Sequence, residues 1–161
     1  MHILWEELTG GLPDAAQLAR LIIRLTAAAV LGGVVGFQRE RARKPAGLRT
    51  HMLVSIGTAV FILACASAGM TPDGISRIVQ GVVTGIGFIG AGAILKPHGS
   101  GGVHGLTTAA SVWMAAAIGV AVGLGTLGLA ILGALFAFVI LSMSRHTMLD
   151  LAPGTGDHLG N

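Results

Sequence analysis

The chain has 161 residues, of which 53% are apolar, 11% are charged and 26 are glycine, with a net charge of +3. Soluble domains carry about 25% charged residues, so this composition argues against a soluble enzyme, a nucleic-acid-binding module and a disordered chain. The single cysteine, Cys65, excludes an intrachain disulfide and a cysteine-based zinc cage. The glycine content is more than twice the average of about 7% and needs a structural reason.

Five apolar stretches predict the fold class, because a membrane-spanning helix needs about 20 apolar residues, with a range of about 17 to 25. The stretches are Leu18–Phe37, Met52–Met70, Ile78–Leu95, Leu106–Leu124 and Leu127–Met143. None contains Asp or Glu, and only Arg20 and Arg24 place charge inside one. We therefore predict an all-α integral membrane bundle of about five transmembrane helices over residues 1–143. A short, disordered cytoplasmic tail is expected at 144–161.

The loops between the stretches are short, and their charges predict the orientation. Gly125 and Thr126 alone separate the last two stretches, which form either a tight helical hairpin or one re-entrant unit. Cytoplasmic loops carry an excess of Lys and Arg. Arg77 is the one basic loop residue on one side, and seven lie on the other: Arg39, Arg41, Arg43, Lys44, Arg49, Lys96 and Arg145. This bias predicts an outside N-terminus and a cytoplasmic C-terminus.

The glycines form two patterns. Three pairs have the four-residue spacing that puts both glycines on one helix face and lets two helices approach closely. They are Gly32 and Gly36, Gly81 and Gly85, and Gly119 and Gly123. The second pattern is the run 85–92, with glycine at Gly85, Gly87, Gly90 and Gly92. Because each glycine costs a helix about 1 kcal/mol relative to alanine, this run is either a tight packing surface or a locally unwound segment that lines a site.

Two arginines in the first stretch lie one turn apart on one helix face. Arg20 is close enough to the membrane surface to extend its charge into the headgroups. Arg24 is deeper and is a candidate functional residue, with a carboxylate or a backbone carbonyl as its partner. Asp14 and Asp73 are the acids on the same predicted side of the membrane.

The loop Gln38–His51 has two interpretations. Its charges Arg41, Arg43 and Lys44 are typical of a topology anchor on anionic lipid. Charge alone does not explain the opposite charges of Arg39 and Glu40 at its start or the later Pro-Ala-Gly-Leu-Arg-Thr-His sequence. The candidate functional residues in this loop are Gln38, Arg39, Glu40, Arg49 and His51.

Two further polar pairs have structural and functional interpretations. Thr107 and Thr108 open the fourth stretch, where they either bond to carbonyls of their own helix or face the glycine-rich third stretch. His98 and His104 share a loop, but no third ligand is evident, so any metal site stays unknown. The sequence has no Walker glycine loop, no HExxH motif and no clustered carboxylate pair. We therefore expect no enzymatic activity and no cofactor.

Four ordered blocks between residues 20 and 125 resemble the MgtC/SapB family. The first block is Arg24-Leu25 with Ala28 and Gly32–Glu40, and the second is Lys44–His51 followed by Met52–Gly57. The third is Ser76–Ile78 leading into Gly85–Gly92, and the fourth is Gly105–Ser111 with Trp113 and Ala116–Gly119. The order and completeness of the blocks make the resemblance specific.

The resemblance implies a multi-pass protein of the bacterial inner membrane that is linked to adaptation to low magnesium and, in pathogens, to survival inside macrophages. A regulatory role that restrains the rotary ATP synthase is also implied. Two features depart from the family pattern. Many members have Glu where this chain has Gln38, and many carry an ACT-like cytoplasmic domain where an 18-residue tail follows the last predicted stretch here.

The sequence therefore favours a non-enzymatic membrane protein that acts in magnesium or stress homeostasis by contacting other membrane complexes. One alternative is a transporter or channel for a cation or small solute, with Glu40, Asp73 and the Arg24 region as polar positions. A second alternative is a binder of lipid or another small ligand. Expected partners are membrane lipids, further copies of the chain in a homo-oligomer with a dimer favoured, and another membrane complex, and we expect no nucleic acid.

Overall fold

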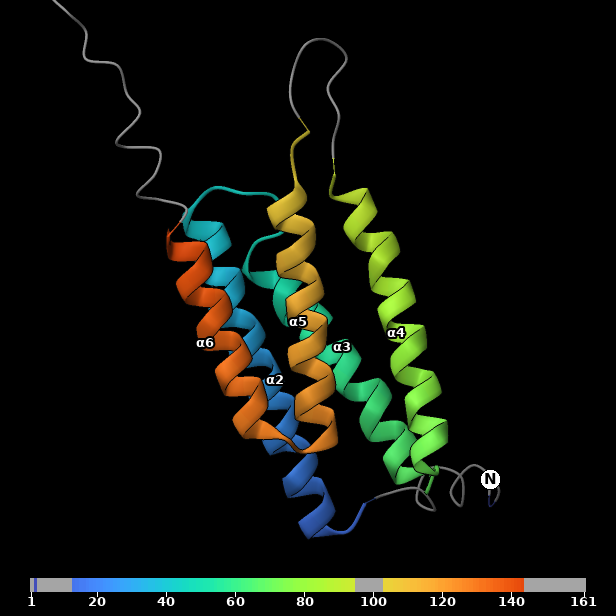
Figure 1. The fold of residues 1–161 in the computed structure, drawn as a ribbon. Helices are drawn as coiled ribbons and strands as arrows, with labels where there is room; N and C mark the ends of the chain where they lie inside the picture. Colours follow the sequence, from blue (N-terminus) through green and yellow to red (C-terminus); the bar gives the residue numbers. More distant parts are fainter. Residues whose placement is uncertain (1, 3–12, 95–102, 144–161) are drawn as a thin grey trace, which may run out of the picture.

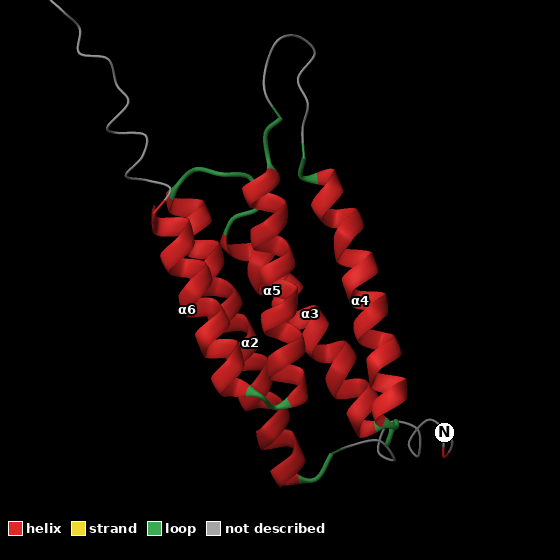
Figure 2. Ribbon diagram, in the orientation of Figure 1, coloured by secondary structure: helices red, strands yellow, loops and turns green. Residues whose placement is uncertain are grey.

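The computed structural model describes residues 2, 13–94 and 103–143, and within these ranges the fold is a bundle of antiparallel helices (Figures 1 and 2). The helices are α2 (Ala15–Arg41), α3 (Leu48–Ser67), α4 (Pro72–Gly92), α5 (Leu106–Leu124) and α6 (Leu127–Met143). The prediction of an all-α fold is confirmed. Four of these helices are long and apolar enough to cross a membrane, while α6 is apolar but has 17 residues.

Local capping explains why two helices begin earlier than predicted. The α4 helix begins at Pro72, where the Thr71 hydroxyl accepts a hydrogen bond from the Gly74 amide at 3.4 Å. The α3 helix begins at Leu48, whose amide donates to the Glu40 carboxylate at 2.8 Å. Residues 38–41 and 48–51 are therefore helical, and the predicted loop Gln38–His51 is reduced to the turn 42–47.

Several predictions lie outside the described residues. These are the disordered tail at 144–161, the loop residues Lys96 and His98, and Arg145. The orientation of the chain in the membrane stays a prediction, since it depends partly on these residues.

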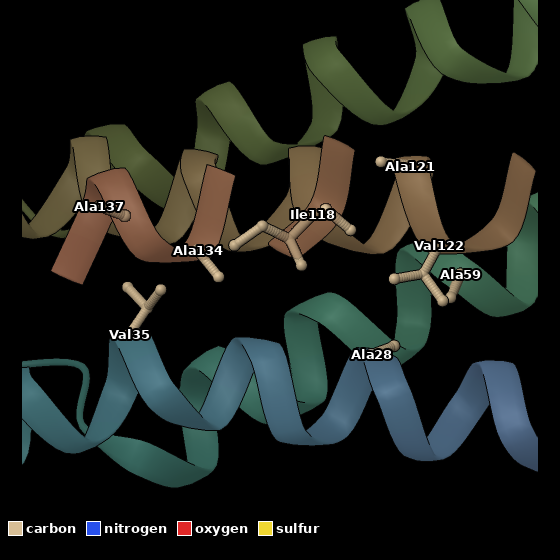
Figure 3. Packing of buried hydrophobic residues seen from close by; sticks show 9 residues of the cluster. Ala28, Val35, Ala59, Ile118, Ala121, Val122, Ala134 and Ala137 are labelled. Atoms are coloured by element: carbon tan, nitrogen blue, oxygen red, sulfur yellow. The ribbon is translucent and has the colours of Figure 1, made fainter. Parts of the chain in front are cut away.

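The core lies where α2, α3, α5 and α6 meet, and it is built from small side chains. Figure 3 shows Ala28 and Val35 of α2 facing Ile118 and Val122 of α5, with alanines of the other helices around them. Because alanine adds little bulk, the helix backbones approach closely, as membrane helices do when they pack without a hydrophobic driving force. The α5 helix occupies the centre of this packing, and more than half of its membrane-spanning window is buried.

Two of the three predicted glycine pairs pack as expected. A Cβ atom at Gly32 would lie 2.7 Å from the backbone oxygen of His51, and one at Gly123 would lie 2.7 Å from Cβ of Ile62. At Gly119 an added Cβ would overlap the hydroxyl of Thr58 and the backbone oxygen of Ser55. These glycines of α2 and α5 therefore set the distance at which both helices contact α3.

The third pair behaves differently. A Cβ atom at Gly81 or Gly85 would meet nothing within 4 Å, so the predicted packing of this pair has no partner within the described chain. The run 85–92 is continuous α-helix, which decides against local unwinding. Only Gly90 in this run packs on a neighbour, with an added Cβ 3.6 Å from Cβ of Ala109. Figure 1 shows α4 at the edge of the bundle.

The link between α5 and α6 is a tight hairpin rather than a re-entrant unit, as Figures 1 and 2 show. Gly125 ends α5 with φ +86°, a left-handed conformation that favours glycine. The hydroxyl of Thr126 donates to the backbone oxygen of Ala121 at 2.9 Å and fixes the start of α6.

Candidate functional site

A buried polar cluster lies where α2, α3 and α5 meet, directly beneath the turn 42–47. We define this polar cluster as Arg39, His51, Thr108 and Ser111, each of which is at most 6% exposed. The guanidinium of Arg39 donates through Nη2 to the hydroxyl of Thr108 at 2.5 Å. Three segments that are far apart in the sequence therefore share one hydrogen-bonded site.

His51 joins the turn to α5. Its Nδ1 lies 2.9 Å from the backbone oxygen of Gly47, and its Nε2 lies 3.0 Å from Oγ of Ser111. The Ser111 hydroxyl also lies 2.8 Å from the backbone oxygen of Thr108, to which it can donate. A carbonyl oxygen can only accept, so Nδ1 carries a proton, and Nε2 exchanges a hydrogen bond with the serine hydroxyl in either protonation state.

Glycine in α2 makes this arrangement possible. A Cβ atom at Gly36 would lie 2.8 Å from Cα of Leu48 and 2.9 Å from Cβ of His51. The first turn of α3 is therefore pressed against α2, and the imidazole is directed away from α2 toward α5. The glycine spacing that the sequence shows as a packing signal also positions the buried histidine.

Arg39 is buried without a counterion among the described residues. Its Nε is enclosed and has no hydrogen-bond partner in the described part of the chain. The nearest acid in sequence, Glu40, instead accepts the Leu48 amide at the start of α3. A buried cation without an opposite charge is destabilising, and apolar replacements at such positions are often neutral or stabilising. Stability therefore does not explain why arginine occupies this position.

The turn above the cluster has a defined backbone. Arg43 and Ala46 adopt left-handed conformations, with φ of 51° and 56°, which residues other than glycine seldom do. Two backbone hydrogen bonds cap the end of α2 around Arg43, from the Arg43 amide to the Glu40 oxygen at 2.9 Å and from the Lys44 amide to the Arg39 oxygen at 3.1 Å. The side chains of Arg43, Lys44 and Arg49 are exposed on this turn and the first turn of α3.

Two other predicted residues tie helices together. Arg24 donates through Nη1 to the backbone oxygen of Gly123 at 3.0 Å, which selects the carbonyl over Asp73 as its partner. Gln38 donates to Oγ of Ser142 at 3.0 Å and so links α2 to α6. The other acid considered for Arg24, Asp14, caps α2 by accepting from the Gln17 amide at 2.6 Å.

The remaining predicted residues lie apart from the cluster. Thr107 is exposed beside the buried Thr108. Asp73 and Arg77 are exposed in the first turns of α4, and Gly85, Gly87 and Gly92 are open on the same helix. No group of three His, Cys, Asp or Glu side chains that could hold a metal ion occurs in residues 13–94 and 103–143. The candidate residues therefore divide into a buried set, a set on α4, and the exposed Glu40, Arg49 and Thr107 on other helices.

Sequence reasoning missed Ser111, Ser55 and Thr58, all of which are buried and polar. The hydroxyl of Thr58 donates to the backbone oxygen of Ala116 at 3.1 Å and so joins α3 to α5. The signal that would have found Ser111 is its position three residues after Thr108, which puts both on one face of α5.

Comparison with known proteins supports one family. The MgtC family model matches residues 25–148. SrpB of Synechococcus elongatus is 41% identical over 133 residues, which are 76% of this chain and 73% of SrpB. YhiD of Escherichia coli K12 is 42% identical over 135 residues, 78% of this chain and 60% of YhiD. MgtC of Salmonella typhimurium LT2 is 47% identical over 104 residues, 65% of this chain and 43% of MgtC.

The chain thus spans less than two thirds of YhiD and of MgtC. No solved structure matches significantly.

Proposed function

The chain belongs to the MgtC family and is a multi-pass protein of the bacterial inner membrane, and from this premise we propose that it is a non-enzymatic regulator in adaptation to low magnesium. It acts by binding other membrane complexes, among which the rotary ATP synthase is the first candidate. The observation that carries the proposal is the defined shape of the basic turn 42–47 and its attachment to the buried cluster.

A turn that only anchors the chain on anionic lipid needs positive charge but no particular backbone shape. This turn instead holds two left-handed residues, Arg43 and Ala46. Each such residue costs about 1 kcal/mol or more. A backbone conformation that costs free energy is expected where side chains must meet a partner in a fixed arrangement. The exposed Arg43, Lys44 and Arg49 then form a basic docking surface for an acidic face of a membrane complex.

The polar cluster supports this turn from below. His51 bonds to the backbone oxygen of Gly47, and the backbone of Arg39 bonds to the Lys44 amide. Because Arg39 and His51 also bind Thr108 and Ser111, a movement of α5 would be transmitted to the turn. In the proposed mechanism the cluster holds the docking surface in position.

Cation transport is the competing function, since the relative YhiD carries a name that proposes magnesium transport. A conduit needs polar groups that face an open path. In the described part of the chain, the polar groups of the cluster are buried and bonded to one another. The arrangement therefore favours the regulator.

Affinity purification of the full chain from cells grown at low magnesium tests the proposal. We expect ATP synthase subunits to co-purify with the unchanged chain, and recovery to fall at least about tenfold for an Arg43→Gln/Lys44→Gln variant, since rim charges govern encounter and orientation. Arg20→Gln is the matched control, because Arg20 is an exposed arginine at the other end of α2.

Magnesium flux in proteoliposomes separates the two functions. Flux carried by the purified chain, together with equal recovery of ATP synthase from both variants, would replace the regulator with a transporter. Absence of flux with turn-dependent recovery supports the regulator.

A further inference from the structure

A groove of about 650 Å³ runs between α3 and α4. Its walls include Gly57 and Phe61 of α3 and Gly81, Gly85 and Ile89 of α4. Figure 1 shows α4 at the edge of the bundle. Leu53 and Phe61, which line the groove, are exposed, so the groove opens toward the surrounding membrane rather than the core. The charged end of the groove lies where α4 begins, whereas the basic turn precedes α3. The turn adjoins the other end of the groove, since its Ala46 packs on the cluster that includes the groove residue Ile86.

Glycines on both walls keep the groove open. A Cβ atom at Gly57, Gly81 or Gly85 would meet nothing within 4 Å. Within the described chain, close packing therefore does not require glycine at these positions, although each glycine costs a helix about 1 kcal/mol relative to alanine. The open space is explained if a molecule from outside the chain occupies it.

One end of the groove is charged. Among the described residues that line it, Arg77 alone carries a charge. Arg77 lies about 7.5 Å along the helix from Pro72 at the start of α4, a depth from which an arginine side chain reaches the headgroups. Its guanidinium forms no hydrogen bond or ion pair with any described residue, including Asp73 one turn earlier. The guanidinium is therefore available to an anionic group at the membrane surface.

The length of the groove indicates which kind of molecule fits it. The helical rise from Arg77 to Ile89, both of which line the groove, is about 18 Å. One leaflet of the hydrocarbon core is about 15 Å thick, whereas a spanning helix of a second copy crosses about 30 Å. An apolar groove as long as one leaflet, with a cation at its interfacial end, has the shape and charge of a site for one lipid.

We infer that this groove binds a phospholipid, whose phosphate pairs with the guanidinium of Arg77 and whose acyl chain lies along Gly81 and Gly85. A guanidinium binds phosphate oxygens through two parallel hydrogen bonds. The apolar walls replace the contacts that the acyl chain makes in the bilayer. The site does not depend on the proposed regulatory function, since it uses none of the residues of the turn or the polar cluster.

Native mass spectrometry of the full chain, delipidated in detergent and titrated with phosphatidylglycerol, tests the site. We expect one tightly retained lipid per chain. The Arg77→Gln variant should bind it at least about tenfold more weakly, because glutamine lacks the charge and the paired hydrogen bonds of the guanidinium. Arg20→Gln is the charge control and should bind it unchanged. Diacylglycerol, which lacks the phosphate, and glycerol 3-phosphate, which lacks the chains, should each bind at least about tenfold more weakly.

A second experiment fills the groove with larger side chains. The Gly81→Leu/Gly85→Leu variant should lose the lipid, while Gly87→Leu should retain it, because Gly87 is equally open but does not line the groove. Equal retention by the unchanged chain and by both groove variants would overturn the inference. So would glycerol 3-phosphate that binds as tightly as the lipid, or a dimer that the groove-filling variant converts to monomer. If the double variant does not fold, the Arg77→Gln comparison decides alone.

Discussion

The glycines of α2 and α5 and the glycines of α4 have the same spacing but opposite surroundings. At Gly32 and Gly119 an added methyl group would strike atoms of α3, whereas at Gly81 and Gly85 it would meet nothing within 4 Å. Both patterns carry the helix cost of glycine. In the first region glycine permits close helix packing inside the chain, and in the second, by our inference, it leaves room for the lipid in the groove.

The comparison shows what a small-residue pattern can predict. The spacing identifies a helix face that permits close approach, but the identity of the neighbour depends on how the helices are arranged. Substitutions that add one methyl group test whether the two regions differ as the structure indicates.

Gly119→Ala should have the largest effect. The added Cβ would overlap the backbone of Ser55 and the hydroxyl of Thr58, and backbone cannot rotate away. We expect a loss of stability of about 3 kcal/mol, the upper part of the range for overpacked cores. The measurement is the fraction of detergent-solubilised protein that stays monodisperse after heating. A variant as stable as the unchanged chain would show that α3 and α5 can separate without cost.

Gly105→Ala should have the second largest effect and should act on the attachment of α4. Gly105 has φ +96°, and an added Cβ would overlap the backbone oxygen of Ala93 at the end of α4. We expect a cost of about 2 kcal/mol from the left-handed backbone and the overlap. Hydrogen–deuterium exchange of the peptide containing Ala93 should increase, while exchange in α2 stays constant. Equal increases in both helices would mean that α4 is coupled to the whole core.

Gly85→Ala should have an effect of opposite sign. Nothing in the described chain lies within 4 Å of the added methyl group, so only the helix propensity changes. We expect the same heating assay to show a gain of about 0.7 kcal/mol. A loss of stability in lipid-free detergent would reveal a packing partner of α4 and would remove the contrast between the two regions.

The sequence predicted the helices better than their contacts. Apolar length and the absence of acids located each helix, because the membrane imposes both. Arg39 and His51 were named as candidate functional residues from the sequence, but their hydrogen-bond partners were not. Thr108 and Ser111 lie about sixty residues beyond His51 in the sequence, and no local pattern specifies which helix face meets another. The partner of Arg24 was predicted only as a carboxylate or a backbone carbonyl. Every residue has a backbone carbonyl, so the sequence does not show which one Arg24 contacts.

Ser55→Ala should have the smallest effect and separates polarity from size in the packed region. Ser55 is fully buried, and its hydroxyl has no hydrogen-bond partner within residues 13–94 and 103–143. Removing an unsatisfied buried hydroxyl is neutral or stabilising, so we expect a gain of about 0.5 kcal/mol in the heating assay. Ser55→Val is the size control and should lose stability. Ser55 packs so closely on α2 that a Cβ atom added at Gly32 would lie only 2.7 Å from Cβ of Ser55, so the larger valine side chain has little room. If Ser55→Ala loses as much stability as Ser55→Val, the Ser55 hydroxyl forms a hydrogen bond in the membrane. The contacts of α3 in the packed region would then include a hydrogen bond as well as close packing of small side chains.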